Sequence, residues 1–249
     1  MSNKREEFID DEEQELYGFP LNTNIEIRVE DLSPTKQLDC YTPSWMNIAI
    51  EQAQEIAARN ENQVDNIIRK YHKSATGSEL EGADTPWCAS FVSWALKESG
   101  MEKTPRSAGS RFFRDESDES SRFIDGRGRQ EEFGEGLMPI SKGEEKLGDI
   151  AVWADLDQYG EHKGSGHVAF VFGKDEDGNR LFLGGNQGDT LGVKEYSVED
   201  TKTRVFIGYF RPEEAENTHA TCDLTQYYNV SDANEAAIGQ EIEIGNSIR

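Results

Sequence analysis

The sequence predicts an α+β domain in which the helices come first and the strands follow. Apolar residues recur at helical spacing between residues 44 and 99. From residue 148 to residue 210 they alternate instead with a period of two, which is typical of half-buried strands. Helices followed by strands favour segregated layers. We therefore expect N-terminal helices packed on an antiparallel β-meander.

Three helices are expected before the strands. The first begins at Thr42-Pro43-Ser44, and the second ends at His72, where a cation would suit the helix dipole. The third runs from about Pro86 to Ser99 and stops at Gly100, a typical C′ glycine. The apolar stripes of the first two helices are Trp45, Ile48, Ala49, Ala53, Ile56 and Ala57, and then Val64, Ile67, Ile68 and Tyr71.

A long insertion separates the helices from the strands. Residues 104–146 are charged and rich in glycine, with one short helix expected near Ser107–Arg114. An Asp177-Gly178 turn then joins two of the predicted strands. The strands are expected at 148–153, 167–173, 181–183, 193–197 and 205–210.

The two ends of the chain are acidic and lack long periodic elements. We therefore expect a domain at 44–211, an acidic N-terminal arm at 1–43 and a loosely held acidic tail at 212–249. Within these ends, Ile25-Glu26-Ile27-Arg28-Val29 suggests a short extended segment, and Tyr227 and Tyr228 can dock on the domain.

Charge and cysteine content limit the partners. The formal net charge of −23 excludes nucleic acid as a natural ligand, because phosphate binding needs clustered Lys and Arg, and favours a basic protein partner. No apolar run approaches the ~20 residues that span a bilayer, so membrane insertion is not expected. An odd cysteine count makes no disulfide framework. Cys40 and Cys222 either pair or remain ordinary thiols.

Cys88 is the candidate nucleophile. Thr85 as N-cap and Pro86 as first helical residue would place it at about the third helical position. Unpaired N–H groups and the helix dipole there would lower its pKa from about 8.5. The alternative is a small buried hydrophobe, since Cys88 opens a helical stripe with Phe91 and Val92.

A cysteine nucleophile needs a base, and the base needs an orienting group. His167 is the first candidate for the base, because it begins a rigid strand after Gly164-Ser165-Gly166; His162, in a loop, is the second. For the orienting group we favour Asn186 over Gln187, although both also suit a turn.

A metal site is the remaining possibility at these positions. It would use His162 and His167 with Asp155 or Asp157, but their spacing fits no ligand pattern. No metal or cofactor is therefore expected.

Several segments, taken in order, resemble the NlpC/P60 and CHAP group of papain-like cysteine peptidases and amidases. The resemblance covers roughly residues 44–211. Its segments are Ile67-Ile68-Arg69-Lys70-Tyr71-His72, Pro86-Trp87-Cys88-Ala89-Ser90-Phe91-Val92, Gly148-Asp149-Ile150-Ala151-Val152-Trp153, Gly166-His167-Val168-Ala169-Phe170-Val171 and Gly184-Gly185-Asn186-Gln187.

The resemblance implies a papain-like fold that hydrolyses peptidoglycan amide bonds without a cofactor. Cys88 would attack the carbonyl, His167 would accept and return a proton, and Asn186 would orient the imidazole. The Cys88 N–H would help to bind the oxyanion, and Trp87 would form a wall of the substrate site. Three departures from the family pattern bear on the scissile bond: the nucleophile lies in Trp87-Cys88-Ala89-Ser90, the acidic insertion enlarges the segment between Cys88 and His167, and the third residue is an amide.

The expected reaction is that of a D,L-endopeptidase, with an N-acetylmuramoyl-L-alanine amidase or phage lysin as the alternative. A protein-directed cysteine hydrolase or deamidase and a non-enzymatic binding module are the competing classes.

Delivery is the second expectation that follows from the resemblance. The N-terminus lacks the apolar region of a signal peptide, so synthesis in the cytoplasm is expected. A wall hydrolase of this kind would need another route to a target-cell periplasm. We expect an antibacterial effector of type VI-like secretion, with a cognate immunity protein and a secretion-system component as partners.

Overall fold

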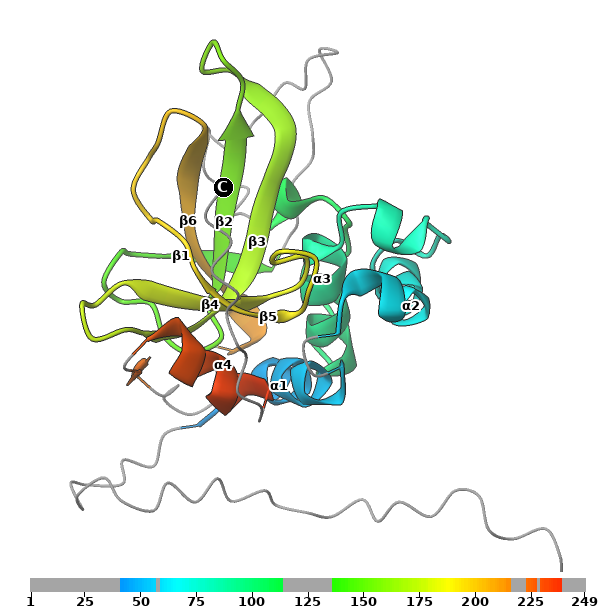
Figure 1. Cartoon of the computed structure of the whole chain (residues 1–249), viewed down its shortest axis with the longest axis horizontal. Coiled ribbons are helices and arrows are strands. Elements are labelled where there is room, and N and C mark those ends of the chain that lie inside the picture. The colour runs from blue at the N-terminus through cyan, green and yellow to red at the C-terminus, as the bar shows by residue number, and fades with distance from the viewer. Residues whose placement is uncertain (1–40, 57–58, 114–135, 216–222, 228, 239–249) are drawn as a thin grey trace, which may run out of the picture. The chain divides into compact units, whose positions relative to one another are not determined.

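The helices and the strands occupy separate regions of the domain, as predicted for an α+β protein (Figure 1). The computed structural model describes residues 41–56, 59–113, 136–215, 223–227 and 229–238. The helices are α1 (Ser44–Ile56), α2 (Asp65–Thr76), α3 (Cys88–Glu98) and α4 (Val230–Ile238). Short 3-10 turns join them at η1 (Glu61–Gln63), η2 (Gly82–Asp84), η3 (Ser110–Phe112) and η5 (Glu213–Ala215).

The strands form one sheet in the order β1-β6-β2-β3-β4-β5, with β7 paired to β3 in parallel. The meander is confirmed for β2 to β5, whose neighbours pair antiparallel. It is wrong for β6, which crosses back to lie beside β2. The strands are β1 (Leu137–Ile140), β2 (Ile150–Leu156), β3 (His162–Lys174), β4 (Arg180–Gly184), β5 (Gly192–Glu195), β6 (Arg204–Pro212) and β7 (Thr225–Gln226).

The burial of β2 explains why β6 returns. Residues Ile150 to Ala154 are all buried, on both faces of the sheet. A strand buried on both faces needs a hydrogen-bonding neighbour at each edge, because unpaired backbone groups away from water are costly. β3 supplies one neighbour and β6 the other, with Ile150 paired to Phe170 and to Phe210.

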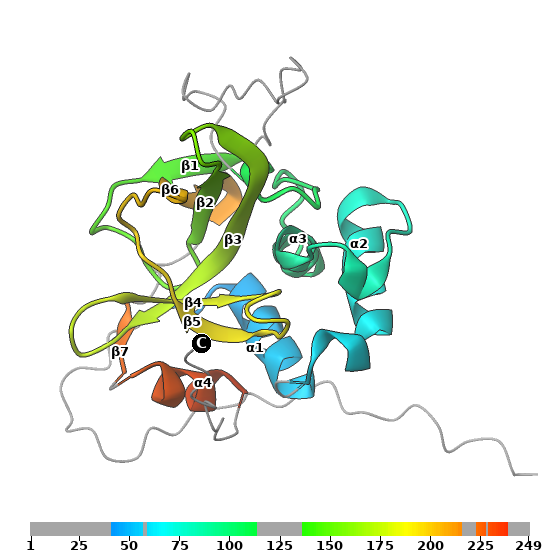
Figure 2. The same cartoon turned by 45° about the horizontal axis from the view of Figure 1, so that its top comes forward.

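Apolar side chains pack on both faces of the sheet. The helices cover one face, where the Phe91 ring of α3 meets Phe170 of β3 edge to face at 6.3 Å. In both views α3 runs beside β3, with α2 outside it (Figures 1 and 2). On the opposite face Trp153 packs against Phe182, with ring centroids 4.9 Å apart. The connection from β5 to β6 crosses this second face (Figure 2).

The start of α3 differs from the prediction. Thr85 does not cap α3, because its N–H bonds back to the carbonyl of Gly82 and closes η2. The chain then passes through Pro86, and Trp87 becomes the N-cap. Cys88 is therefore the first helical residue rather than the third. The predicted end is confirmed, since Ser99 is the C-cap and Gly100 follows with φ +85°.

The C-terminal segment is more ordered than predicted. Residues 230–238 form α4, which packs on α1 and β5. Tyr227 docks as expected, stacked on Phe172 with centroids 5.4 Å apart. The loose tail is therefore wrong for this part of the segment, because Ala233, Ala237 and Ile238 are buried.

The insertion also contains unpredicted structure. Its β1 pairs with β6, while the short helix expected near residues 107–114 is the 3-10 turn η3. The predictions for the N-terminal arm, for Cys40, Cys222, Tyr228 and His219, and for residues 114–135 lie outside the described residues. Among the helices that the structure describes, none has the length and hydropathy needed to cross a membrane.

Candidate active site

Cys88 lies where α3 begins, and its sulfur faces backbone N–H groups. As the first helical residue, it belongs to the turn whose N–H groups have no partner within the helix. The backbone groups of Cys88, Ala89 and Val168 lie close enough to the sulfur to favour its thiolate form. The first two groups belong to α3 and the third to β3, so the sulfur bridges the helix start and the sheet.

A gap in the sheet makes this contact possible. The Val171 N–H bonds to the Asp149 carbonyl on the β2 side of β3. Because backbone groups alternate along a strand, the Val168 N–H points to the other side, toward β4. Strand β4 ends at Gly184, and its register with β3 runs only to the Phe170–Leu183 pair. No β4 residue pairs with Val168, and the Cys88 sulfur lies near the Val168 backbone.

The protonation of Cys88 differs from the prediction. Burial raises the pKa of the thiol, and this outweighs the backbone hydrogen bonds and the positive charge of Arg204, which lower it. Cys88 exposes only 5% of its surface, so little water remains to solvate a thiolate. The resting state is therefore a neutral thiol at neutral pH.

His167 immediately precedes the Val168 N–H and is also buried. Burial, reinforced by Arg204 and Lys194 and opposed by Asp155, lowers the pKa of His167 to about 3. Its Nε2 is buried and has no hydrogen-bond partner. The neutral imidazole is therefore the resting form, which is the form that can accept a proton.

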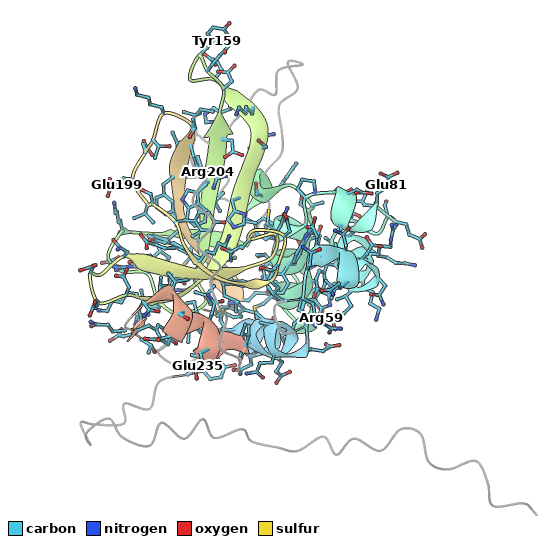
Figure 3. All side chains as sticks on the ribbon, in the orientation of Figure 1. Arg59, Glu81, Tyr159, Glu199, Arg204 and Glu235 are labelled. Atoms are coloured by element: carbon cyan, nitrogen blue, oxygen red, sulfur yellow. The ribbon has the colours of Figure 1, made fainter. Side chains whose placement is uncertain are left out.

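Three further side chains, Tyr196, Arg204 and Asp155, group around these residues, and the sequence pattern did not indicate Tyr196 and Arg204. The Tyr196 ring lies against His167, with centroids 4.9 Å apart. The Arg204 guanidinium lies 5.8 Å from the centre of the Tyr196 ring, and its Nε donates a hydrogen bond to Asp155 Oδ1 at 2.7 Å. Figure 3 labels Arg204 in front of β2 and β6. Their sequence signal is weak because they come from three separate strand ends.

An open cavity of about 420 Å³ adjoins this group. Tyr196 both lines the cavity and contacts His167, whereas neither His167 nor Cys88 is among the residues that line it. The remaining lining residues are Asp155, Lys163, Ser197, Glu199, Thr201, Thr203 and Arg204. Charged side chains of both signs therefore surround a space large enough for a peptide fragment.

The two amide candidates occupy different positions. Continuing the β3–β4 register by three residues from Phe170–Leu183 brings Asn186 level with His167. Asn186 takes a left-handed backbone conformation with φ +56°, and no hydrogen bond joins it to His167. Gln187 instead ties together the β4–β5 turn, where its Nε2 donates to the carbonyls of Phe182 and Gly192. Asn186 therefore stays the candidate third residue.

Trp87 has a packing role that the sequence did not indicate. It is fully buried, stacks near Tyr71 and donates from Nε1 to Glu61 Oε2 at 3.0 Å. Gly185 lies directly on its ring. The expectation that Trp87 forms an exposed wall of the substrate site is wrong, because packing covers the indole.

The other described histidines lie apart from Cys88. His72 is buried inside α2 and is not a terminal cation, because burial lowers its pKa. Its Nε2 donates to the Gly82 carbonyl at 3.0 Å, so its Nδ1 accepts from Ser90 Oγ at 2.7 Å. His162, which was expected in a loop, is the exposed first residue of β3, and His167 lies inside that strand rather than at its start. Within the described ranges no group of three or more His, Cys, Asp or Glu side chains could hold a metal ion.

A cysteine at a helix start, beside a sheet strand that carries a neutral histidine, is the arrangement that a cysteine- and histidine-dependent hydrolase would use. Residues 80–186 match the family model of the CHAP domain. CHAP domains are generally amidases or peptidases of this class, so the resemblance seen in the sequence is confirmed over this segment. No curated protein and no solved structure matches the chain.

The matched segment contains Cys88 and His167 and ends at Asn186. Tyr196 and Arg204 follow it. The match supports peptidoglycan as the substrate class and amide hydrolysis as the reaction.

Proposed function

We propose that this protein is a papain-like peptidoglycan hydrolase that cleaves a stem-peptide amide bond as a D,L-endopeptidase. One observation carries the proposal: the Cys88 sulfur contacts the Val168 backbone next to His167, within the segment that matches the CHAP domain.

The chemistry begins from two neutral groups. As the Cys88 sulfur bonds to the scissile carbonyl carbon, its proton passes to the imidazole of His167. The carbonyl oxygen becomes an oxyanion, and the unpaired N–H groups at the start of α3 stabilise it. Collapse of the intermediate breaks the C–N bond while the imidazolium returns its proton to the leaving amine.

Water completes the cycle. His167, neutral again, takes a proton from a water molecule that attacks the thioester carbonyl. The C–S bond breaks, the carboxylic acid leaves, and Cys88 regains its proton. Asn186 is the proposed third residue, placed to receive an imidazole hydrogen bond once substrate adjusts the site.

Muropeptide profiling tests the reaction and the bond. Purified sacculi are digested with the wild type, with Cys88→Ala and with His167→Gln, and the products are separated and identified by mass spectrometry. We expect the wild type to release fragments with a new D-glutamate carboxyl end and a free diamino-acid amine, and both variants to release none. Tyr159→Ala serves as the control, because Tyr159 is 80% exposed at the tip of the β2–β3 turn.

Other results would assign a different scissile bond or contradict the proposal. Lactyl-linked glycan ends would assign the muramoyl–L-alanine amide instead. Sacculi left intact by folded wild-type protein, at every ionic strength tried, would contradict peptidoglycan hydrolysis.

We also propose that the chain acts as an antibacterial effector delivered to a target-cell periplasm, guarded by an immunity protein in the producer. The strongly acidic composition supports this, because an anionic wall would repel a freely diffusing protein of net charge −23. Expression with an added export signal should lyse a Gram-negative host, and Cys88→Ala should not. Growth unaffected by exported, folded wild type would refute the effector role.

A further inference from the structure

The imidazole of His167 contacts aromatic rings, whereas a hydrogen bond to an orienting amide was expected. Its ring contacts Trp153 at 5.8 Å and 35° and Tyr196 at 4.9 Å and 41°, measured between ring centroids and planes. Trp153 and Tyr196 also contact each other, with centroids 5.4 Å apart, so the three rings form one cluster. It is 5% exposed, and its Nε2 is buried without a partner. In the described residues no side chain hydrogen-bonds that nitrogen, so contact with the rings fixes the plane of the imidazole.

The Tyr196 ring is itself anchored from several strands. Trp153 Nε1 donates to the Ser197 carbonyl at 2.8 Å, which fastens the β5–β6 connection to β2. The Arg204 guanidinium lies 5.8 Å from the Tyr196 ring centroid, within cation–π range. Arg204 in turn bonds Asp155 of β2 at 2.7 Å.

Asp155 extends this chain of contacts to β3. Its Oδ2 accepts from Ser165 Oγ at 3.0 Å, two residues before His167. The contacts therefore run from β2 and β3 through Asp155, Arg204 and Tyr196 back to the imidazole. A loop side chain without such anchoring would not orient a ring reliably.

We propose that Tyr196 and Arg204 are positioning residues for His167: Tyr196 holds the plane of the imidazole, and Arg204 fixes Tyr196 beside it. We name Trp153, His167, Tyr196 and Arg204 the His167 cluster. This inference rests on the proposed role of His167 as the base. It gives a role to Tyr196 and Arg204, which follow the segment that matches the CHAP domain.

Charged side chains, Arg204 among them, also act on the imidazole of His167. The charged groups that act on His167 are Arg204 of β6, Lys194 of β5 and Asp155 of β2. Arg204 and Lys194 disfavour the imidazolium, while Asp155 favours it. Arg111 of η3, the turn packed against β3, lies beside Gly164.

Arg204 also acts on Cys88. Its positive charge lowers the pKa of both groups, which favours the charged form of the thiol and the neutral form of the imidazole. One guanidinium thus makes the thiol a better acid and disfavours a charged imidazole. Removing this charge should let the pKa of His167 rise.

Two measurements that need no peptidoglycan test the proposal. The first is the rate of Cys88 alkylation by iodoacetamide at pH 7, compared in wild type, Tyr196→Leu, Tyr196→Phe and the exposed control Tyr159→Leu. If the ring orients the base, Tyr196→Leu should slow alkylation by about 10²-fold. Tyr196→Phe keeps the ring and should react like the wild type, as should Tyr159→Leu.

The second measurement is the NMR titration of the His167 ring in wild type, Arg204→Gln and Arg204→Lys. We expect Arg204→Gln to move the His167 midpoint to higher pH, and Arg204→Lys to restore much of the wild-type value. Circular dichroism checks that each variant is folded. If Tyr196→Leu fails to fold, the Arg204 titrations decide alone.

Two results would overturn the proposal. One is alkylation of folded Tyr196→Leu at the wild-type rate, and the other is an unchanged His167 titration in Arg204→Gln. Inactivity of the wild type on sacculi would refute only the proposed function, because both measurements report on Cys88 and His167 directly.

Discussion

At the scale of single residues, Gly185 shows why the glycine pair before Asn186 matters for the nucleophile. A Cβ at Gly185 would lie 2.4 Å from Cζ3 of the Trp87 indole and 3.1 Å from Cβ of Phe91. Trp87 is the N-cap of α3 and is fully buried. The absence of a side chain at residue 185 therefore lets the end of β4 approach the start of the helix that carries Cys88.

Gly185→Ala should destabilise the protein by about 1–3 kcal/mol, because the rigid indole cannot give way without a backbone shift. Urea denaturation followed by tryptophan fluorescence measures the change. The matched comparison is the same substitution in a Trp87→Phe background, where the smaller ring should reduce the cost. Equal costs in both backgrounds would show that the indole is not the obstacle.

At the scale of elements, α4 completes the edge of the sheet with one side chain. Strand β5 ends the strand order, so the outer backbone groups of Val193 need partners. Asn234 supplies them: its Oδ1 accepts from the Val193 N–H and its Nδ2 donates to the Val193 carbonyl, both at 2.7 Å. The amide thus bonds Val193 as a neighbouring strand would.

Asn234→Ala should cost about 1–3 kcal/mol, since it leaves buried backbone groups of Val193 unpaired. The control is Glu235→Ala at the exposed neighbouring position of the same helix, labelled in Figure 3, which should change stability little. Thermal melts of the two variants give the comparison. Equal melting temperatures would mean that water replaces the amide and that α4 does not seal this edge.

His72 connects α2 to two other elements. Its ring joins α2 to α3 through Ser90 and to η2 through Gly82. The predicted helix-end cation is thus a neutral link that fixes the helix of the nucleophile.

At the scale of the whole molecule, the net charge of −23 governs the approach to a polymeric substrate. Repulsion between this protein and an anionic wall is screened over about 10 Å at 0.1 M salt. A short soluble substrate feels little of this repulsion once it has entered the site.

Degradation of sacculi should therefore speed up as NaCl rises from about 10 mM to about 150 mM, because screening weakens the repulsion. Hydrolysis of an uncharged soluble peptide amide should change little over the same range. Parallel turbidity and chromatographic assays compare the two substrates. Slower degradation of sacculi with salt would indicate that a local basic surface, and not the net charge, controls binding.

The sequence by itself determined the order of elements and the candidate chemistry. Periodicity predicted the order of α1, α2, α3 and the strands β2 to β6, because helices and strands bury apolar side chains at different intervals. It placed the end of α2 and the start of β3 less well, since α2 continues to Thr76 and β3 begins at His162. The cysteine at a helix start and the histidine after Gly166 are local patterns, so the sequence alone indicates them. Among the missed elements, β1 and α4 are short and have weak periodicity, and long-range contacts to β6, β5 and α1 stabilise them.

Only the tertiary structure decided the state and surroundings of the candidate site. The short end of β4 opens the place where Cys88 meets Val168, and burial there reverses the expected direction of the thiol pKa. The His167 cluster of Trp153, His167, Tyr196 and Arg204 gathers residues from β2, β3, the β5–β6 connection and β6, and no local pattern links positions so far apart. Desolvation and ring contact depend on which surfaces meet, and those surfaces exist only once the sheet has formed.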